Sequence, residues 1–165
     1  MSAVPTSRTA TVTLPTDEEI LITREFEAPP HLVYKAWTTP ELVKRWWHAR
    51  RGEMKSAEID LRVGGRWRYV MTAHQGFEVA FHGEYREIVP NERIVTTEVY
   101  EGAPATDEPP PVDVITFTDV DGRTRVELLV KCASKQTRDM IIESGMEDGL
   151  QDALDLVEQV AISLR

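Results

Sequence analysis

The sequence predicts an α+β fold in which one long C-terminal helix packs against an antiparallel sheet. Three observations predict it. Between residues 53 and 131, apolar and polar residues alternate in several segments separated by short turn signals, as expected for half-buried strands. Two short segments with helical spacing precede these strands, and one amphipathic helical segment closes the chain. Helices that are segregated in sequence from a run of antiparallel strands are typical of α+β folds.

The length and composition are those of a single domain. The chain has 165 residues, of which 41% are hydrophobic and 28% are charged, and this length suffices for one core without disulfides or a structural metal. The net charge of −9 disfavours a nucleic-acid backbone or an anionic membrane surface as a partner. The one cysteine, Cys132, cannot form an internal disulfide. We therefore expect no nucleic-acid partner and no membrane partner.

Residues 1–19 carry no clear pattern, and we expect them to form a mobile segment ahead of one domain that spans residues 20–165. The start of the chain lacks an apolar run after basic residues, so it does not resemble a signal peptide. No stretch approaches the roughly 20 apolar residues of a membrane-spanning helix. We therefore expect a cytoplasmic protein.

The first strand is predicted at residues 20–27, where alternate residues are apolar except for Arg24. Two short helices are predicted after it, at residues 31–37 and 40–47, with a Thr-Thr-Pro turn between them. Pro40 suits the first position of the second helix because its missing N–H group needs no partner there.

Six further strands are predicted before the last helix, each ended by a turn signal. They are residues 54–61, 66–72, 77–88, 93–100, 113–118 and 124–131. Gly-Gly, Gln-Gly, Pro-Asn and Asp-Gly pairs form the tight turns, and a Pro-rich loop occupies residues 102–111.

The last helix is predicted at residues 135–164, with Ser134 as its N-cap. Its apolar residues lie within about a 100° arc, which is the width of a core-facing stripe. This stripe consists of Ile142, Met146, Gly149, Leu150, Ala153, Val157, Val160 and Leu164.

The strands at residues 66–72 and 77–88 place large side chains on one face. These side chains are Trp67, Tyr69, Met71, Phe77, Phe81 and Tyr85. They either wall a cavity for an apolar ligand or fill the core, and Met146 and Leu150 of the last helix are expected to face them. Gly149, between those two, either allows close packing against a strand or leaves volume for a ligand.

Trp46 and Trp47 are adjacent, so they cannot both point into the core from one helix. We expect one of them to pack inward. The other is expected near the mouth of the cavity or on a partner surface.

Glu98 is the main candidate for an acidic group in the cavity, and two registers remain open. If Thr96 and Glu98 share the inward face, Glu98 is a buried carboxylate whose pKa is raised by desolvation. If Thr97 faces inward instead, Glu98 is a solvated surface charge. Arg62 and Arg68 either pair with Glu98 or anchor a ligand carboxylate, or they form ordinary surface ion pairs.

The sequence lacks recognisable metal-binding and catalytic signatures. His31, His48, His74 and His82 do not have the spacing of metal ligands. The Gly-Gly pair at residues 64–65 opens a strand rather than a helix, so it does not form a phosphate loop. We therefore expect no metal and no cofactor.

Four segments, taken in order, resemble one known family. They are ITREFEAPPHLVYKAWTTPELVKRWW, IDLRVGGRWRYVM, FHGEYREIVPNERIVTTEVYEG and SKQTRDMIIESGMEDG. They resemble the bacterial relatives of the heat-shock-protein-90 ATPase activator homologue, within the START-related (SRPBCC) superfamily that also includes polyketide cyclases and the birch-pollen allergen. The resemblance covers residues 20–164 and implies the helix-grip fold, in which a curved antiparallel sheet wraps around a long C-terminal helix and encloses a cavity.

The resemblance implies little about activity, because many bacterial members have no assigned function. Many relatives have an aromatic residue near Glu98 and a Trp near Met146, and this sequence departs from them at both positions. We therefore expect a pocket of different shape and higher polarity.

The function we expect is the binding or carriage of a small hydrophobic or amphipathic molecule in this cavity, without chemistry of the protein's own. One alternative is a cyclase- or hydrolase-type enzyme, which requires Glu98 or a histidine to face inward. A second alternative is a chaperone-associated interaction module, which requires an exposed apolar patch. The sequence is compatible with a homodimer but does not determine the oligomeric state.

Overall fold

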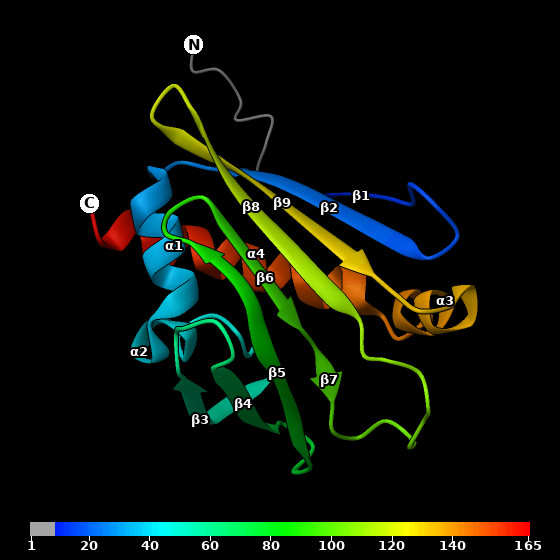
Figure 1. Cartoon of the computed structure of the whole chain (residues 1–165). Coiled ribbons are helices and arrows are strands. Elements are labelled where there is room, and N and C mark those ends of the chain that lie inside the picture. Colours follow the sequence, from blue (N-terminus) through cyan, green and yellow to red (C-terminus); the bar gives the residue numbers. More distant parts are fainter. Residues whose placement is uncertain (1–8) are drawn as a thin grey trace.

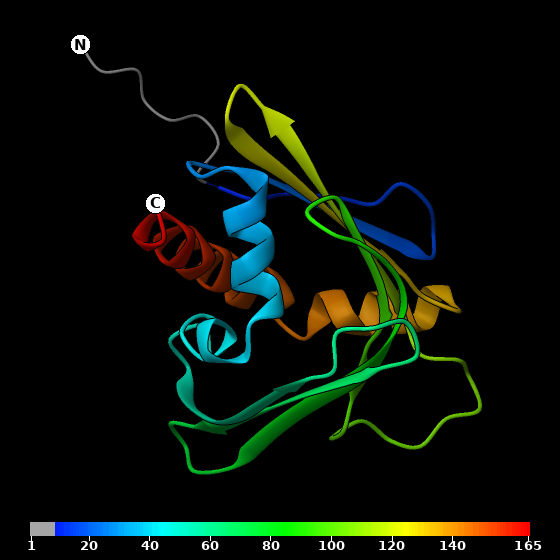
Figure 2. The ribbon, with the colours of Figure 1, turned by 60° about the vertical axis from the view of Figure 1, so that its left-hand side comes forward.

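The computed structural model describes residues 9–165, which form a curved antiparallel sheet with the helices gathered on its concave side (Figures 1 and 2). The strands are β1 (Thr11–Thr13), β2 (Glu19–Phe26), β3 (Gly52–Ile59), β4 (Arg66–Ala73), β5 (Glu78–Val89), β6 (Arg93–Thr97), β7 (Val99–Tyr100), β8 (Val112–Val120) and β9 (Arg123–Lys131). The helices are α1 (Pro30–Thr38), α2 (Pro40–Val43), α3 (Lys135–Glu143) and α4 (Met146–Ser163). The predicted α+β helix-grip architecture is confirmed.

The sheet has the strand order β1-β2-β9-β8-β6-β5-β4-β3, and β7 pairs with β5. β5 has 12 residues and belongs to both halves of the sheet, because residues 78–84 pair with β4 and residues 85–89 pair with β6. The register shifts between Tyr85 and Glu87, and such an irregularity bends a strand. The bend carries β3, β4 and the first half of β5 around the helices (Figure 2).

The core is most completely closed where β2, α1 and the second half of α4 meet. Ile20 and Phe26 of β2 are at most 1% exposed, and Val33 of α1 and Val157 of α4 are fully buried in the same cluster. Complete burial of side chains of this size stabilises the fold by about 1.5–3 kcal/mol each.

Arg24 sits in the same inward row of β2 and is held by two acids of α4. Its guanidinium contacts Asp155 Oδ1 at 2.6 Å and Glu158 Oε1 at 3.1 Å. Glu158 is itself buried and accepts a second hydrogen bond from the backbone N–H of Glu27 at 3.0 Å. This charge cluster therefore links β2 to α4.

The predicted helix at residues 135–164 is wrong in one respect, because it is divided into α3 and α4. Ser144 and Gly145 separate the two helices, and Gly145 has a φ of 83°. This left-handed conformation ends a helix and favours glycine, which lacks a Cβ. Ser134 caps α3 as predicted, since its side chain accepts a hydrogen bond from Thr137 N.

Three smaller differences from the prediction concern element boundaries. Residues 11–13 form β1, which pairs with β2, although the sequence suggested no element before residue 20; residues 1–8 of that segment lie outside the described residues. α2 ends at Val43 rather than near Trp47, and the predicted strand at 93–100 is interrupted at Glu98. No helix in the described range is both long and apolar enough to cross a membrane.

Candidate functional site

Aromatic side chains form a continuous wall on the inward face of β4 and β5. Trp67 and Tyr69 of β4 are buried, and their ring centroids lie 4.7 Å apart. Trp47, which follows α2, lies edge-on to both Tyr69 and Phe81 with centroid distances of 5.6 Å. Phe81 stacks on Tyr100 at 5.0 Å. The aromatic wall, defined by these five residues, thus runs from the buried Trp67 to the exposed Tyr100.

Hydrogen bonds fix the polar edges of the aromatic wall. The side chains of Tyr69 and Tyr85 hydrogen-bond to each other, and burial raises the pKa of both phenols. Trp67 Nε1 donates to Thr96 Oγ1 at 2.7 Å, and this hydroxyl donates to the carbonyl oxygen of Glu84 at 3.1 Å. The aromatic rings are therefore held in place by both packing and hydrogen bonds, and the two tyrosines are neutral at physiological pH.

Glu98 faces this wall from the break between β6 and β7. Thr96 and Thr97 of β6 are equally buried, but Thr96 accepts a hydrogen bond from Trp67 of the aromatic wall, so Thr96 lies on the inward face. Burial and Tyr85 raise the pKa of Tyr69 most, and the negative charge of Glu98 adds to this shift. The carboxyl of Glu98 hydrogen-bonds to Asp113. Glu98 is partly buried, so it lies at the boundary between the buried site and solvent.

Asp113 is the site residue that the sequence analysis missed. It lies on β8 opposite Thr96 and Val130, is 7% exposed, and its Oδ1 atom has no hydrogen-bond partner among residues 9–165. Burial first, then the charge and hydrogen bond of Glu98, raise the pKa of Asp113 well above its usual range. Its position in the sequence could have indicated that it is buried, because Asp113 shares one face of the strand with the apolar residues Ile115 and Phe117.

Cys132 lies beside this acid pair, just after β9. It is buried, and this burial is the main cause that raises its pKa to about 11. A thiol with such a high pKa is protonated at neutral pH and is a poor nucleophile. Cys132 therefore acts as a small apolar wall residue rather than as a reactive group.

The remaining predicted site residues are divided between the wall and other places. Met71 is buried, and Met146 and Leu150 are partly buried against the core. Phe77 is 55% exposed, so its inclusion in the inward face was wrong; it precedes β5 and lies in the turn after β4, where neighbouring strands no longer cover it.

Gly149 is not a site of tight packing. Leaving aside its own helix, a Cβ added there would meet only Arg51, with Nε at 3.9 Å and Cζ at 4.0 Å. These are ordinary van der Waals distances to a flexible side chain. The sequence offered two explanations for a glycine at this position, close packing against a strand or volume for a ligand. The distances exclude close packing against a strand.

The arginines proposed as partners of Glu98 lie elsewhere. Arg62 pairs with Asp60 at 2.8 Å and Arg68 with Glu101 at 2.8 Å, and both arginine side chains are exposed. These two arginines therefore form the ordinary surface ion pairs that were the simpler expectation.

Trp46 and Trp47 both pack inward. Trp46 is 5% exposed and donates its Nε1 hydrogen to the carbonyl oxygen of Ala36 at 2.9 Å, while Trp47 covers the aromatic wall. The exposed tryptophan surface that would favour an interaction module is not formed by these two residues.

The chemistry that this site offers is hydrogen bonding and proton exchange at a carboxyl pair beside the aromatic wall. A buried, protonated carboxyl can donate or accept a hydrogen bond, as a general acid does. Within residues 9–165, no group of three or more His, Cys, Asp or Glu side chains is arranged to hold a metal ion.

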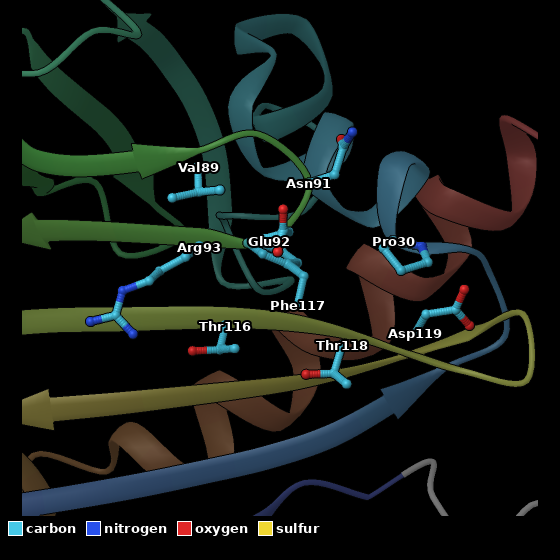
Figure 3. A pocket seen from close by; sticks show the side chains of 9 residues that line it. All are labelled: Pro30, Val89, Asn91, Glu92, Arg93, Thr116, Phe117, Thr118 and Asp119. Atoms are coloured by element: carbon cyan, nitrogen blue, oxygen red, sulfur yellow. The ribbon is translucent and has the colours of Figure 1, made fainter.

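A separate hollow lies where β5, β6 and β8 approach the start of α1. It is an open groove of about 520 Å³ beside the β5–β6 turn, with side chains from β6, β8 and the start of α1 (Figure 3). Arg93, Thr116 and Thr118 give it a polar lining. This groove does not contain the acid pair or the aromatic wall.

Comparisons with known proteins agree with this fold. The model of the family described as "Activator of Hsp90 ATPase homolog 1-like protein" matches residues 27–161. Protein Ms6760 from Mycobacterium smegmatis is 26% identical over 92% of this chain and 96% of its own, with a TM-score of 0.81. A protein from Rhodobacter sphaeroides is 22% identical over 94% of this chain and 99% of its own, with a TM-score of 0.84.

A protein of unknown function from Staphylococcus aureus has the same fold. It is 22% identical over 89% of this chain and 96% of its own, with a TM-score of 0.68. No curated protein matches the sequence.

Proposed function

Because this chain belongs to the Activator of Hsp90 ATPase homolog 1-like family, within a superfamily whose members typically bind ligands, we propose that it binds a small hydrophobic or amphipathic molecule. The binding site in this proposal lies between the first half of α4 and the aromatic wall of β4 and β5. The protein acts there as a carrier or sensor and performs no chemistry of its own.

The observation that carries the proposal is incomplete burial of apolar side chains on facing surfaces. Inward side chains of the sheet and the facing side chains of α3 and α4 are only partly buried: Met54, Ile59, Phe81, Leu128, Ile142, Met146 and Leu150. In a closed core such side chains lose nearly all exposure, as Val157 and Ala161 do further along α4. A ligand bound between these surfaces would cover the side chains that the protein alone leaves partly exposed.

Fixed polar groups support the same reading. Binding sites for small molecules combine a mainly apolar wall with a few placed polar groups. The Tyr69–Tyr85 pair and the acids Glu98 and Asp113 supply such groups beside the aromatic wall. A carrier needs nothing further from the protein.

Native mass spectrometry of the protein purified from its own host tests the proposal directly. We expect a small molecule to be retained at gentle activation and released at higher collision energy. Wild-type protein that carries no molecule, and that binds none from an extract of its host, would contradict the proposal.

The substitution Gly149→Leu provides the matched structural test. Because only the flexible Arg51 side chain lies near an added Cβ, a leucine should fit here without overpacking the core. If the space beside Gly149 belongs to the binding site, ligand retention should be lost. The free energy of unfolding should fall by less than the roughly 1–3 kcal/mol of an overpacked core. Gly149→Ala is the control, since it adds one methyl group and should retain the ligand.

A second candidate function, acid catalysis in the same site, is favoured by one specific observation. Asp113 is buried with a raised pKa and touches a second carboxyl, an arrangement that also occurs in acid–base enzymes. If the protein turns over a substrate, Glu98→Gln should lower the rate about a hundredfold, the usual scale of such catalysis. Under the carrier proposal the same change alters affinity only.

A further inference from the structure

We propose that the bound molecule carries an amine, and that Glu98 and Asp113 hold it as an ammonium ion against the aromatic wall. This inference rests on the proposed function, because it names the chemistry of the ligand at the same site. Three independent features of the described residues lead to it.

The first feature is an unused hydrogen-bonding atom. Asp113 is 7% exposed, and its Oδ1 has no partner among the described residues. A buried polar atom without a partner costs free energy that any suitable ligand group recovers. The surrounding inward residues of β8 and β9, Ile115 and Val130, are apolar and cannot supply that group. A hydrogen-bond donor on the ligand can.

The second feature is the charge of the acid pair. Burial, and then the neighbouring charge of Glu98, raise the pKa of Asp113, because like charges at short range repel. A neutral Asp113 therefore lies beside the charged carboxylate of Glu98. Neither Glu98 nor Asp113 forms a salt bridge with any residue from 9 to 165. The cation near Cys132 is Arg138, whose guanidinium is engaged by Asp139 at 2.9 Å and by the carbonyl oxygen of Thr16 at 2.7 Å. A cation on the ligand would therefore meet a charge that the protein leaves unpaired.

The third feature is the aromatic wall beside the pair. Tyr69 lies between Trp67 and Trp47, and after burial and Tyr85 the nearby charge of Glu98 contributes to its raised pKa. Aromatic faces attract cations within about 6 Å of the ring centroid. A carboxylate together with aromatic faces favours an ammonium group over a hydroxyl, and it repels a carboxylate.

Three probes with one ring system separate these head groups: 2-naphthylmethylamine, 2-naphthylmethanol and 2-naphthoate. We expect isothermal titration calorimetry at pH 7 to show that the amine binds about tenfold or more tightly than the alcohol, the scale of a hydrogen bond to a charged group. The carboxylate should bind most weakly. Glu98→Gln and Asp113→Asn should each reduce the ratio between amine and alcohol toward one.

Glu41→Gln is the matched control, because it removes the same charge from a residue whose side chain is 80% exposed, and it should leave the ratio unchanged. Equal affinities for the three probes, or tightest binding of the carboxylate, would overturn the amine inference while leaving the proposed binding site standing. If the amine preference is unchanged in both Glu98→Gln and Asp113→Asn, these two residues do not hold the ammonium group and the inference is wrong. Failure of all three probes to bind would count against the proposed function as well.

Discussion

Asp113 lies on the buried face of β8, together with Ile115 and Phe117. The alternation along this strand would lead one to expect an apolar residue at its position. Its carboxyl is buried, touches Glu98, and has a pKa raised well above the usual range. A carboxyl in this state is tolerated because it is neutral. Its cost to stability therefore depends on pH.

The pH dependence of stability tests this protonation state. The unfolded chain releases the Asp113 proton near a pKa of about 3.9, whereas the folded protein retains it to higher pH, so the folded state loses stability as the pH rises above that value. Asp113→Asn removes this effect. Relative to wild type, its free energy of unfolding should increase between pH 4.5 and 6.5 by up to about 1.4 kcal/mol per pH unit.

Urea unfolding of both proteins at several pH values measures this difference. Asp107→Asn, at an exposed loop position, serves as the control and should follow the wild-type pH dependence. Parallel curves for Asp113→Asn and wild type would mean that the folded protein does not hold this proton.

At the scale of elements, α4 is anchored to β2 by the cluster of Arg24, Asp155 and Glu158. Removing one partner from a buried ion pair leaves an uncompensated charge, which costs about 3–5 kcal/mol. Glu158→Ala should therefore destabilise the fold by about this amount in urea unfolding.

The double substitution Arg24→Met/Glu158→Leu should cost much less than the sum of the two single changes, because it removes both buried charges and keeps the volume. Additive costs would show that the two side chains do not stabilise the fold as a pair.

The break between α3 and α4 gives a second prediction at this scale. Gly145 has a φ of 83° and no neighbouring atom within 4 Å of an added Cβ, so a side chain there is penalised only by backbone conformation. Gly145→Ala should destabilise the protein by about 1–2 kcal/mol. Gly149→Ala, four residues further on inside α4, should stabilise it by about 0.5–1 kcal/mol. Effects of the same sign on thermal unfolding would contradict this assignment of the break.

At the scale of the whole molecule, a ligand between the sheet and α4 contacts both, so it should stabilise the complete domain. At a free concentration of 100 times its Kd, a ligand adds about 2.7 kcal/mol, which corresponds to a rise in Tm of about 5–10 °C for a domain of this size. With 2-naphthylmethylamine, differential scanning fluorimetry should show this rise for wild type. Gly149→Leu should show none, and an equal rise in the variant would place the bound amine elsewhere.

The parts of the molecule that the sequence predicted are those with strong periodicity. The alternation of Trp67 and Tyr69 identified the inward face of β4, and the apolar stripe of the last helix identified the side that packs on the sheet. The division at Gly145 was missed because the apolar residues continue with nearly the same spacing on both sides of it.

The site could be predicted only in part. Glu98 follows threonines and valines, which occur on both the buried and the exposed face of a sheet. The direction of its side chain therefore depends on how β6 pairs with β5 and β8. Asp113 becomes important because strands β6 and β8 bring it beside Glu98, and this contact has no trace in local sequence. β1 was missed because three residues carry too little pattern and are held only by pairing with β2.

The pairing of β2 with β9 has a consequence for synthesis of the chain. Arg24 pairs with Val126 and Phe26 with Thr124, so about a hundred residues must be translated after β2 before its partner exists. At about 5–20 residues per second, the edge of β2 that pairs with β9 stays open on the ribosome for about 5–20 s, because the other edge is the one that pairs with β1. Ile20, Ile22 and Phe26 are uncovered during this time. Unpaired apolar strands are prone to aggregation, so the nascent chain is most vulnerable at its beginning, and its first long strand is among the last to be incorporated.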